Sequence, residues 1–139
     1  MATTMRLLLN LDVADLDTAV AFYTAAFGLR PARRLGESVL ELDGAQLPIY
    51  LLEKPAGSVG ATGSTRDYAR HWTPVHVDVV VDDVDAALAR VLAAGATQEG
   101  AVREANWGRI VQVADPFGHG WCLLQFVGRG YDEIAVADS

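Results

Sequence analysis

The sequence predicts an α+β fold built from two successive copies of one β-α-β-β-β unit. The first observation is an internal repeat: a shift of 68 residues places residues 13–26 on residues 81–94, with seven of fourteen positions identical. The second is an apolar strand-like run before each copy of the repeated helix. The third is a set of three short strand-like runs after it. Alanine inflates the identity, so the aligned aspartates and the matching flanks carry more weight.

The first unit begins with a predicted strand over 7–13, followed by a helix whose apolar face has a helical spacing. The residues of that face are Leu16, Ala19, Val20, Tyr23 and Phe27. Asp15 is the expected N-cap of this helix, and Gly28 stands where a left-handed C-cap belongs. Gly36 and Asp43-Gly44 are turn signals. They separate three expected strands at 30–35, 38–43 and 47–53.

The second unit repeats this order from a strand predicted over 75–81. Its helix has the apolar face Val84, Ala87, Leu88, Val91 and Leu92. The N-cap is either Asp82 or Asp83, and Gly95 is the expected C-cap. Three strands are expected at 97–103, 109–114 and 120–127. Half a domain of this size cannot cover its own sheet, so we expect the two units to pack together.

The predicted organisation is a single domain over 1–127. Module one spans about 5–53 and module two about 73–127. The connection at 54–72 starts with small residues and ends in aromatic ones, which fits either a linker or a mobile functional loop. Residues 128–139 form a tail, in which Ile134 and Val136 either add an edge contact or fray.

Composition excludes several classes of protein. The 139 residues are 51% hydrophobic and 21% charged, which is incompatible with disorder, and no apolar run is long enough to cross a membrane. The net charge of −7 argues against nucleic-acid binding. We expect no signal peptide, since only Arg6 and a short leucine run follow Met1. The one cysteine fits a reducing cytoplasm.

Several of these features occur together in one known superfamily. They are the paired modules, the helix-opening aspartates, Phe22-Tyr23 late in the first helix, and Ala-Asp-Pro-Phe-Gly-His-Gly-Trp at 114–121, preceded by Trp107-Gly108. Over about 5–127 the chain resembles the vicinal oxygen chelate superfamily, which includes glyoxalase I, extradiol dioxygenases, and fosfomycin- and bleomycin-resistance proteins. The resemblance implies an incomplete eight-stranded mixed barrel, with the site on its concave face.

The resemblance also implies four positions for metal ligands, on the first and last strand of each module. In this chain they are Leu8, Tyr50, His76 and Cys122. Only His76 matches the pattern of the metal-dependent enzymes, and too few donors remain for a catalytic zinc or ferrous site. We therefore expect no cofactor; a divalent metal is the alternative.

A second arrangement includes Asp78, which lies two residues beyond His76 and so on the same strand face. His76, Asp78 and Cys122 would make an unconventional metal site. Otherwise Asp78 either shares a hydrogen bond with His76 in a wet cavity or points outward. Cys122 fits a small core residue better than a nucleophile, and no catalytic residue is assigned.

The expected ligand-binding residues also include three tryptophans at strand edges or turns, where indoles can stack on a flat ligand. Trp121 could equally fill the core. The full expected set is Tyr50, Trp72, His76, Asp78, Trp107, Trp121 and Cys122.

The functional hypothesis is a metal-free protein that binds a small molecule, as bleomycin-resistance proteins do. The acidic charge and the tryptophans favour a cationic aromatic ligand. The alternatives are a glyoxalase- or dioxygenase-type enzyme that uses His76 with a metal, and an accessory or regulatory partner domain. A homodimer is expected, because incomplete barrels leave exposed strand edges.

Overall fold

The computed structural model describes residues 3–137 and divides the chain into two compact units, Met1–Tyr68 and Ala69–Ser139. The division lies inside the predicted connection, so each unit contains one of the expected modules. Within the described residues, each unit holds one α-helix and one four-stranded mixed sheet, and neither sheet closes on itself. This confirms the α+β fold with two βαβββ modules.

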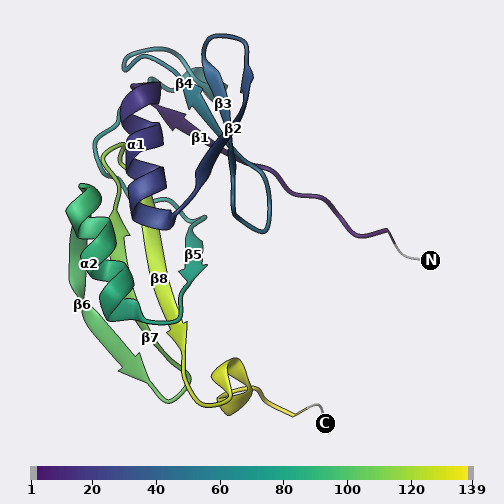
Figure 1. Cartoon of the computed structure of the whole chain (residues 1–139), viewed down its shortest axis with the longest axis vertical. Helices are drawn as coiled ribbons and strands as arrows, with labels where there is room; N and C mark the ends of the chain where they lie inside the picture. The colour runs from purple at the N-terminus through teal and green to yellow at the C-terminus, as the bar shows by residue number, and fades with distance from the viewer. Residues whose placement is uncertain (1–2, 138–139) are drawn as a thin grey trace. The chain divides into compact units, whose positions relative to one another are not determined.

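The sheet of unit 1 has the strand order β1-β4-β3-β2 (Figure 1). Strand β1 runs parallel to β4, and the other neighbours are antiparallel. The elements are β1 (Leu9–Val13), α1 (Leu16–Phe27), β2 (Arg30–Leu35), β3 (Val39–Asp43) and β4 (Ile49–Glu53).

The sheet of unit 2 repeats this topology as β5-β8-β7-β6, again with one parallel pair, β5 with β8. The elements are β5 (Val77–Val80), α2 (Val84–Ala94), β6 (Thr97–Ala105), β7 (Gly108–Ala114) and β8 (Gly120–Phe126). In both units a bulge interrupts the pairing of the outer antiparallel strands.

Both helices begin on an aspartate, as predicted. The Asp15 carboxylate accepts hydrogen bonds from two backbone N–H groups of the first turn of α1, and Asp83, rather than Asp82, does the same for α2. A side chain from the last strand of each module then accepts the N–H of the first helical residue. Glu53 does so for α1 at 2.7 Å, and Gln125 for α2 at 2.9 Å.

The helix faces that pack on the sheets differ slightly from the predicted stripes. Helix α1 buries Leu16, Ala19, Phe22, Tyr23 and Ala26. Phe22 was missing from the predicted face, whereas Val20 and Phe27 are only half-buried. Helix α2 buries Val84, Ala87 and Val91 and leaves Leu92 partly exposed. In each helix, the residues along the centre of the predicted apolar face are buried, and the differences lie at the edges of that face.

The first part of the connection packs onto unit 1 instead of forming a free spacer. Arg66 Nε donates to Asp12 Oδ2 on β1 at 2.8 Å, and Arg66 Nη1 donates to the Val59 carbonyl at 3.0 Å. The Tyr68 hydroxyl donates to the Lys54 carbonyl at 2.7 Å. A short 3₁₀ helix, η1 (Ala61–Gly63), lies within this segment.

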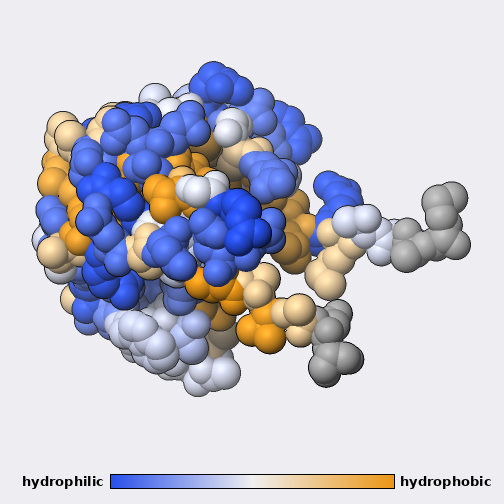
Figure 2. All heavy atoms as spheres, turned by 90° about the horizontal axis from the view of Figure 1, so that it is seen from below, coloured by the Kyte–Doolittle hydropathy of each residue, from blue (hydrophilic) through white to orange (hydrophobic). Residues whose placement is uncertain are grey.

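The start of the C-terminal tail is also folded. A 3₁₀ helix, η2 (Gly130–Glu133), places the Tyr131 ring 4.8 Å from that of Phe126 and 5.1 Å from that of Trp107. Ile134 and Val136 remain exposed, and Figure 2 shows hydrophobic side chains beside the C-terminal end. Within residues 3–137, neither helix has the length and apolar character needed to span a bilayer.

Candidate functional site

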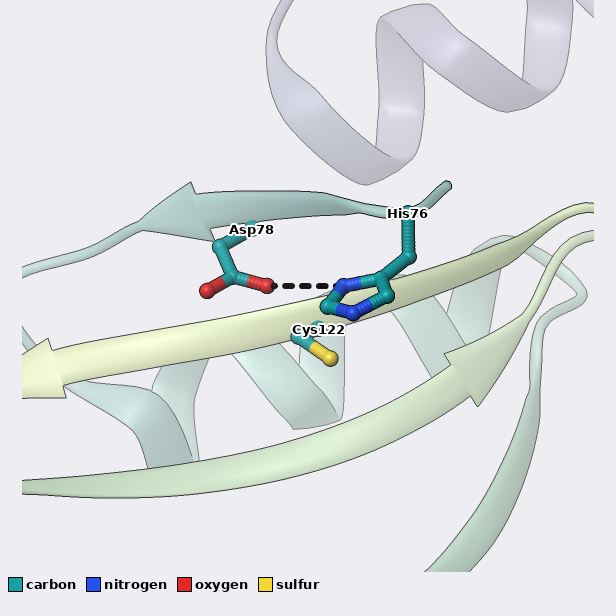
Figure 3. A group of neighbouring side chains, drawn as sticks. All are labelled: His76, Asp78 and Cys122. Carbon is teal, nitrogen blue, oxygen red and sulfur yellow. Dashed lines mark ion pairs between the residues drawn. The ribbon is translucent and has the colours of Figure 1, made fainter. Parts of the chain in front are cut away.

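The parallel pair β5–β8 brings three of the predicted site residues together in unit 2. Asp78 lies opposite Cys122 in the strand register, and His76 lies two residues before Asp78, so the three side chains share one face. One nitrogen, one carboxylate oxygen and the sulfur of this cluster lie within 4.8 Å of one another, and the side chains point toward a common centre (Figure 3).

The cluster has a buried base and an exposed rim. Cys122 is 4% exposed, whereas the side chains of Asp78 and His76 are 33% and 57% exposed. His76 Nδ1 lies 3.6 Å from Asp78 Oδ1, too far for a hydrogen bond but within ion-pair range when the imidazole is protonated. At this distance the two side chains do not form the hydrogen bond that was one alternative for Asp78, but both share a face with Cys122.

The environment of Cys122 favours the neutral thiol. Burial raises the pKa of Cys122, and the neighbouring Asp78 carboxylate raises it further, while Gln112 and Arg103 act in the opposite direction. A thiol with a raised pKa is a poor nucleophile at neutral pH.

A polar row extends from the cluster across the sheet of unit 2. Gln112 on β7 lies opposite Cys122, and Glu99 on β6 lies opposite Gln112. Arg70 Nε donates to Glu99 Oε2 at 2.8 Å, and this contact raises the pKa of Arg70. A β-carbon at Gly120 would collide with the Arg70 guanidinium. Arg70 therefore links the segment that leads to His76 to strand β6.

The matching face of unit 1 holds a different network, in which the carboxylate is paired. Asn10 lies opposite Tyr50, and Tyr50 lies opposite Glu41. This row corresponds to Asp78, Cys122 and Gln112 in unit 2, in the same order. The Tyr50 hydroxyl donates to Glu41 Oε2 at 2.9 Å, and Arg33 donates to both carboxylate oxygens at 2.8–2.9 Å. These contacts, with Arg33 first, lower the pKa of Glu41 to about 2.

The four family positions do not fit a bound catalytic metal. Leu8 offers no donor atom, and the hydroxyl of Tyr50 is engaged by Glu41. The register supports Tyr50 as the counterpart of Cys122. Tyr50 pairs with Asn10 and Cys122 pairs with Asp78, and these two partners are 68 residues apart, the shift of the repeat. The remaining positions, His76 and Cys122, are two donors where at least three are needed.

The three tryptophans have different environments. Trp121 is 5% exposed, and its Nε1 donates to Asp115 Oδ2 at 2.9 Å. It adjoins Cys122 in the sequence and so faces the opposite side of the sheet, in the core of unit 2. Trp107 packs against Tyr131 in the turn before β7. Trp72 is 74% exposed in the segment before β5.

Two residues of this face were missed by sequence reasoning. Gln112 lies opposite Cys122 in the register of β7 and β8, and Glu99 pairs with Arg70, yet both were read only as strand residues. The sequence did contain a signal for Gln112, because this polar residue lies between the buried Val111 and Val113 and so faces the other side of the strand. The alignment of Gln112 and Glu99 with Cys122 depends on strand register, which the sequence pattern leaves open.

Comparisons with known proteins agree with this architecture. The glyoxalase-like domain family matches residues 9–124. An uncharacterized protein of Mycobacterium bovis is 34% identical over 139 residues, covering 94% of this chain and 90% of that protein.

Solved structures give the same picture of the fold. A glyoxalase-related enzyme from Fulvimarina pelagi superposes with a TM-score of 0.68 at 20% identity, covering 89% of this chain and 88% of that one. The fosfomycin resistance protein FosX from Listeria monocytogenes superposes with a TM-score of 0.66 at 21% identity, covering 90% and 93%. With two βαβββ modules and a family match over most of its length, this chain belongs to the glyoxalase-like family, within the vicinal oxygen chelate superfamily.

Proposed function

We propose that this protein binds a small planar organic cation on the polar face of unit 2 and needs no metal to do so. The observation that supports the proposal is the state of Asp78. Two other carboxylates on the sheet faces, Glu41 and Glu99, are each held by an arginine. Within residues 3–137, the only ion pair of Asp78 is the 3.6 Å contact with His76. Its partly exposed charge is available to a cationic ligand.

The net charge of −7 favours the approach of such a ligand. Trp72, which is largely exposed and four residues before His76, is the indole best placed in the sequence to stack on it. The names of similar structures include bleomycin- and fosfomycin-resistance proteins, which supports a small-molecule role by analogy. Leu8 and the engaged Tyr50 speak against the metal-dependent alternative. A cytoplasmic location is part of the proposal and rests on the free thiol of Cys122.

The test is a titration of chelator-dialysed protein with bleomycin and with a planar cationic dye, followed by tryptophan fluorescence. We expect saturable quenching that weakens modestly with salt, because screening acts over about 10 Å at 0.1 M. Asp78→Asn should cost about 1–3 kcal/mol of binding free energy, the range for hydrogen bonds to charged groups. Asp82→Asn is the matched control, since it removes an exposed charge just beyond β5.

Two outcomes would contradict the proposal. Binding that appears only after a divalent metal is added would favour the enzyme alternative. If neither compound changes the fluorescence or raises the melting temperature, the chain would be better described as an accessory or regulatory partner domain, because a ligand selective for the native state must stabilise it.

A further inference from the structure

The polar face of unit 2 carries a positive charge as well as the negative charge of Asp78. Arg103 on β6 lies opposite Ile110, and Ile110 lies opposite Leu124. Because Leu124 is two residues from Cys122, this row lies on the same side of the sheet as Asp78 and Cys122. The charge of Arg103 is felt at Cys122, two strands away, where it works against the burial that raises the pKa of this thiol. Arg103 and Asp78 therefore share one electrostatic environment.

The guanidinium of Arg103 is left over when the other charges of this part of the sheet are paired. The two carboxylates nearest to it in the sequence already have arginine partners, since Glu99 pairs with Arg70 and Glu104 pairs with Arg109, both at 2.8 Å. Within residues 3–137, no hydrogen bond or ion pair involves the side chain of Arg103, and the residue is exposed. Its charge is therefore open to a ligand, as that of Asp78 is.

We propose that the ligand of this face carries a carboxylate in addition to its cationic aromatic part, and that Arg103 binds this carboxylate. The inference rests on the proposed function, in which Asp78 binds the cation. A guanidinium presents parallel N–H donors that match the two oxygens of a carboxylate, and such charged hydrogen bonds are among the stronger ones in proteins. The ligand class is then a zwitterion rather than a simple cation.

The strand register limits how far apart the two charges of the ligand must be. Strands β8 and β7 separate β5 from β6, so three strand spacings place the two backbones about 14 Å apart. Arg103 is aligned with Val80, two residues beyond Asp78. The Asp78 carboxylate lies beside Cys122 on the neighbouring strand (Figure 3), and the long side chain of Arg103 covers part of the remaining interval. A molecule of two or three fused rings spans such a gap, whereas the two charges of an α-amino acid are too close together.

The experiment compares two rhodamine dyes that share one cationic ring system. One dye has a free carboxylate, and the other carries the same group as its methyl ester. Binding of each dye to the full-length protein is followed by fluorescence anisotropy. We expect the parent to bind the dye with the free carboxylate about tenfold or more tightly than the ester, which is the effect of one hydrogen bond to a charged group. Arg103→Gln should bring the two affinities together.

Arg90→Gln is the matched control and should keep the preference of the parent. Arg90 is an exposed arginine of α2, and this helix packs on the opposite face of the sheet, where Gln125 contacts its first residue. The inference is wrong if the parent binds the two dyes equally, or if Arg103→Gln keeps the same preference as Arg90→Gln. Its failure is distinguishable from that of the proposed function. If both dyes bind equally and Asp78→Asn weakens both, only this inference fails, whereas if neither dye binds the parent, both are wrong.

Discussion

Single residues at equivalent positions give the two modules different chemistry. Asn10, Tyr50 and Glu41 on one sheet correspond in register to Asp78, Cys122 and Gln112 on the other. In unit 1 the charge sits on β3, where an arginine neutralises it and a tyrosine hydroxyl donates a hydrogen bond to it. In unit 2 it sits on the edge strand β5, where an imidazole is its partner. The same backbone therefore supports one closed network and one open cluster.

The closed network predicts an acid-dependent loss of stability. The folded pKa of Glu41 is about 2, below its ordinary value of 4.5, so folding favours the ionised carboxylate. The stability it contributes is present above about pH 4.5 and is lost as the pH falls toward 2. Glu41→Gln should therefore lower the melting temperature at pH 6 and flatten its decline between pH 4.5 and 2.

Thermal melts across this pH range provide the check. Glu37→Gln serves as the control, because Glu37 is an exposed carboxylate in the turn between β2 and β3. If the Glu41 variant and the parent lose stability in parallel as the pH falls, the network does not act in this way.

At the level of residues, the sequence predicted those site features that depend on local alternation. The common face of His76 and Asp78 follows from a two-residue spacing, and the position of Cys122 followed from the resemblance. The hydrogen bond from Trp121 to Asp115 was not foreseen, since it depends on how the turn before β8 folds. The Tyr50–Glu41 contact could not be predicted without knowing the register of the two strands that carry these residues.

The turn between β7 and β8 shows how one residue organises an element. Asp115 is 6% exposed, and its carboxylate accepts the backbone N–H groups of Phe117 and His119 as well as the indole N–H of Trp121. Removing this acceptor leaves buried donors without their partner, at about 1–3 kcal/mol each. We expect Asp115→Ala to reduce the free energy of unfolding by at least about 3 kcal/mol.

Denaturant unfolding at neutral pH measures this loss. Asp43→Ala, at the corresponding turn of unit 1, is the control, because Asp43 is exposed there. A loss in the Asp115 variant no larger than that of the control would show that the turn does not depend on this carboxylate. Asp115→Asn should lie between the two, since the amide keeps one acceptor oxygen.

Among the elements, those with local signals were predicted best. Both helices start and end at the expected aspartate and glycine, because caps depend on adjacent residues. Strands were less well bounded: 75–81 was expected, and β5 covers Val77–Val80. The packing of the connection was missed because Arg66 and Asp12 are 54 positions apart.

At the scale of the whole molecule, two features lead us to expect self-association. Each four-stranded sheet has two edge strands, β1 and β2 in one unit and β5 and β6 in the other, which carry backbone groups open to further pairing. Exposed hydrophobic side chains lie at the start of the chain and at β5, among them Met5, Leu7, Leu8, Val75 and Val80. A second copy of the chain would cover such surfaces.

We therefore expect a homodimer whose stability increases with salt. Two copies that each carry a charge of −7 repel one another, whereas burial of apolar side chains does not depend on charge. Raising the ionic strength from about 0.01 M to about 0.1 M shortens the Debye length from about 30 Å to about 10 Å and so reduces the repulsion. Sedimentation equilibrium at micromolar concentration should give twice the chain mass of 14.9 kDa, with a larger dimer fraction at the higher salt. A single species of chain mass at both salt concentrations would exclude the dimer, and a dimer that dissociates as salt rises would point instead to an interface held by ion pairs.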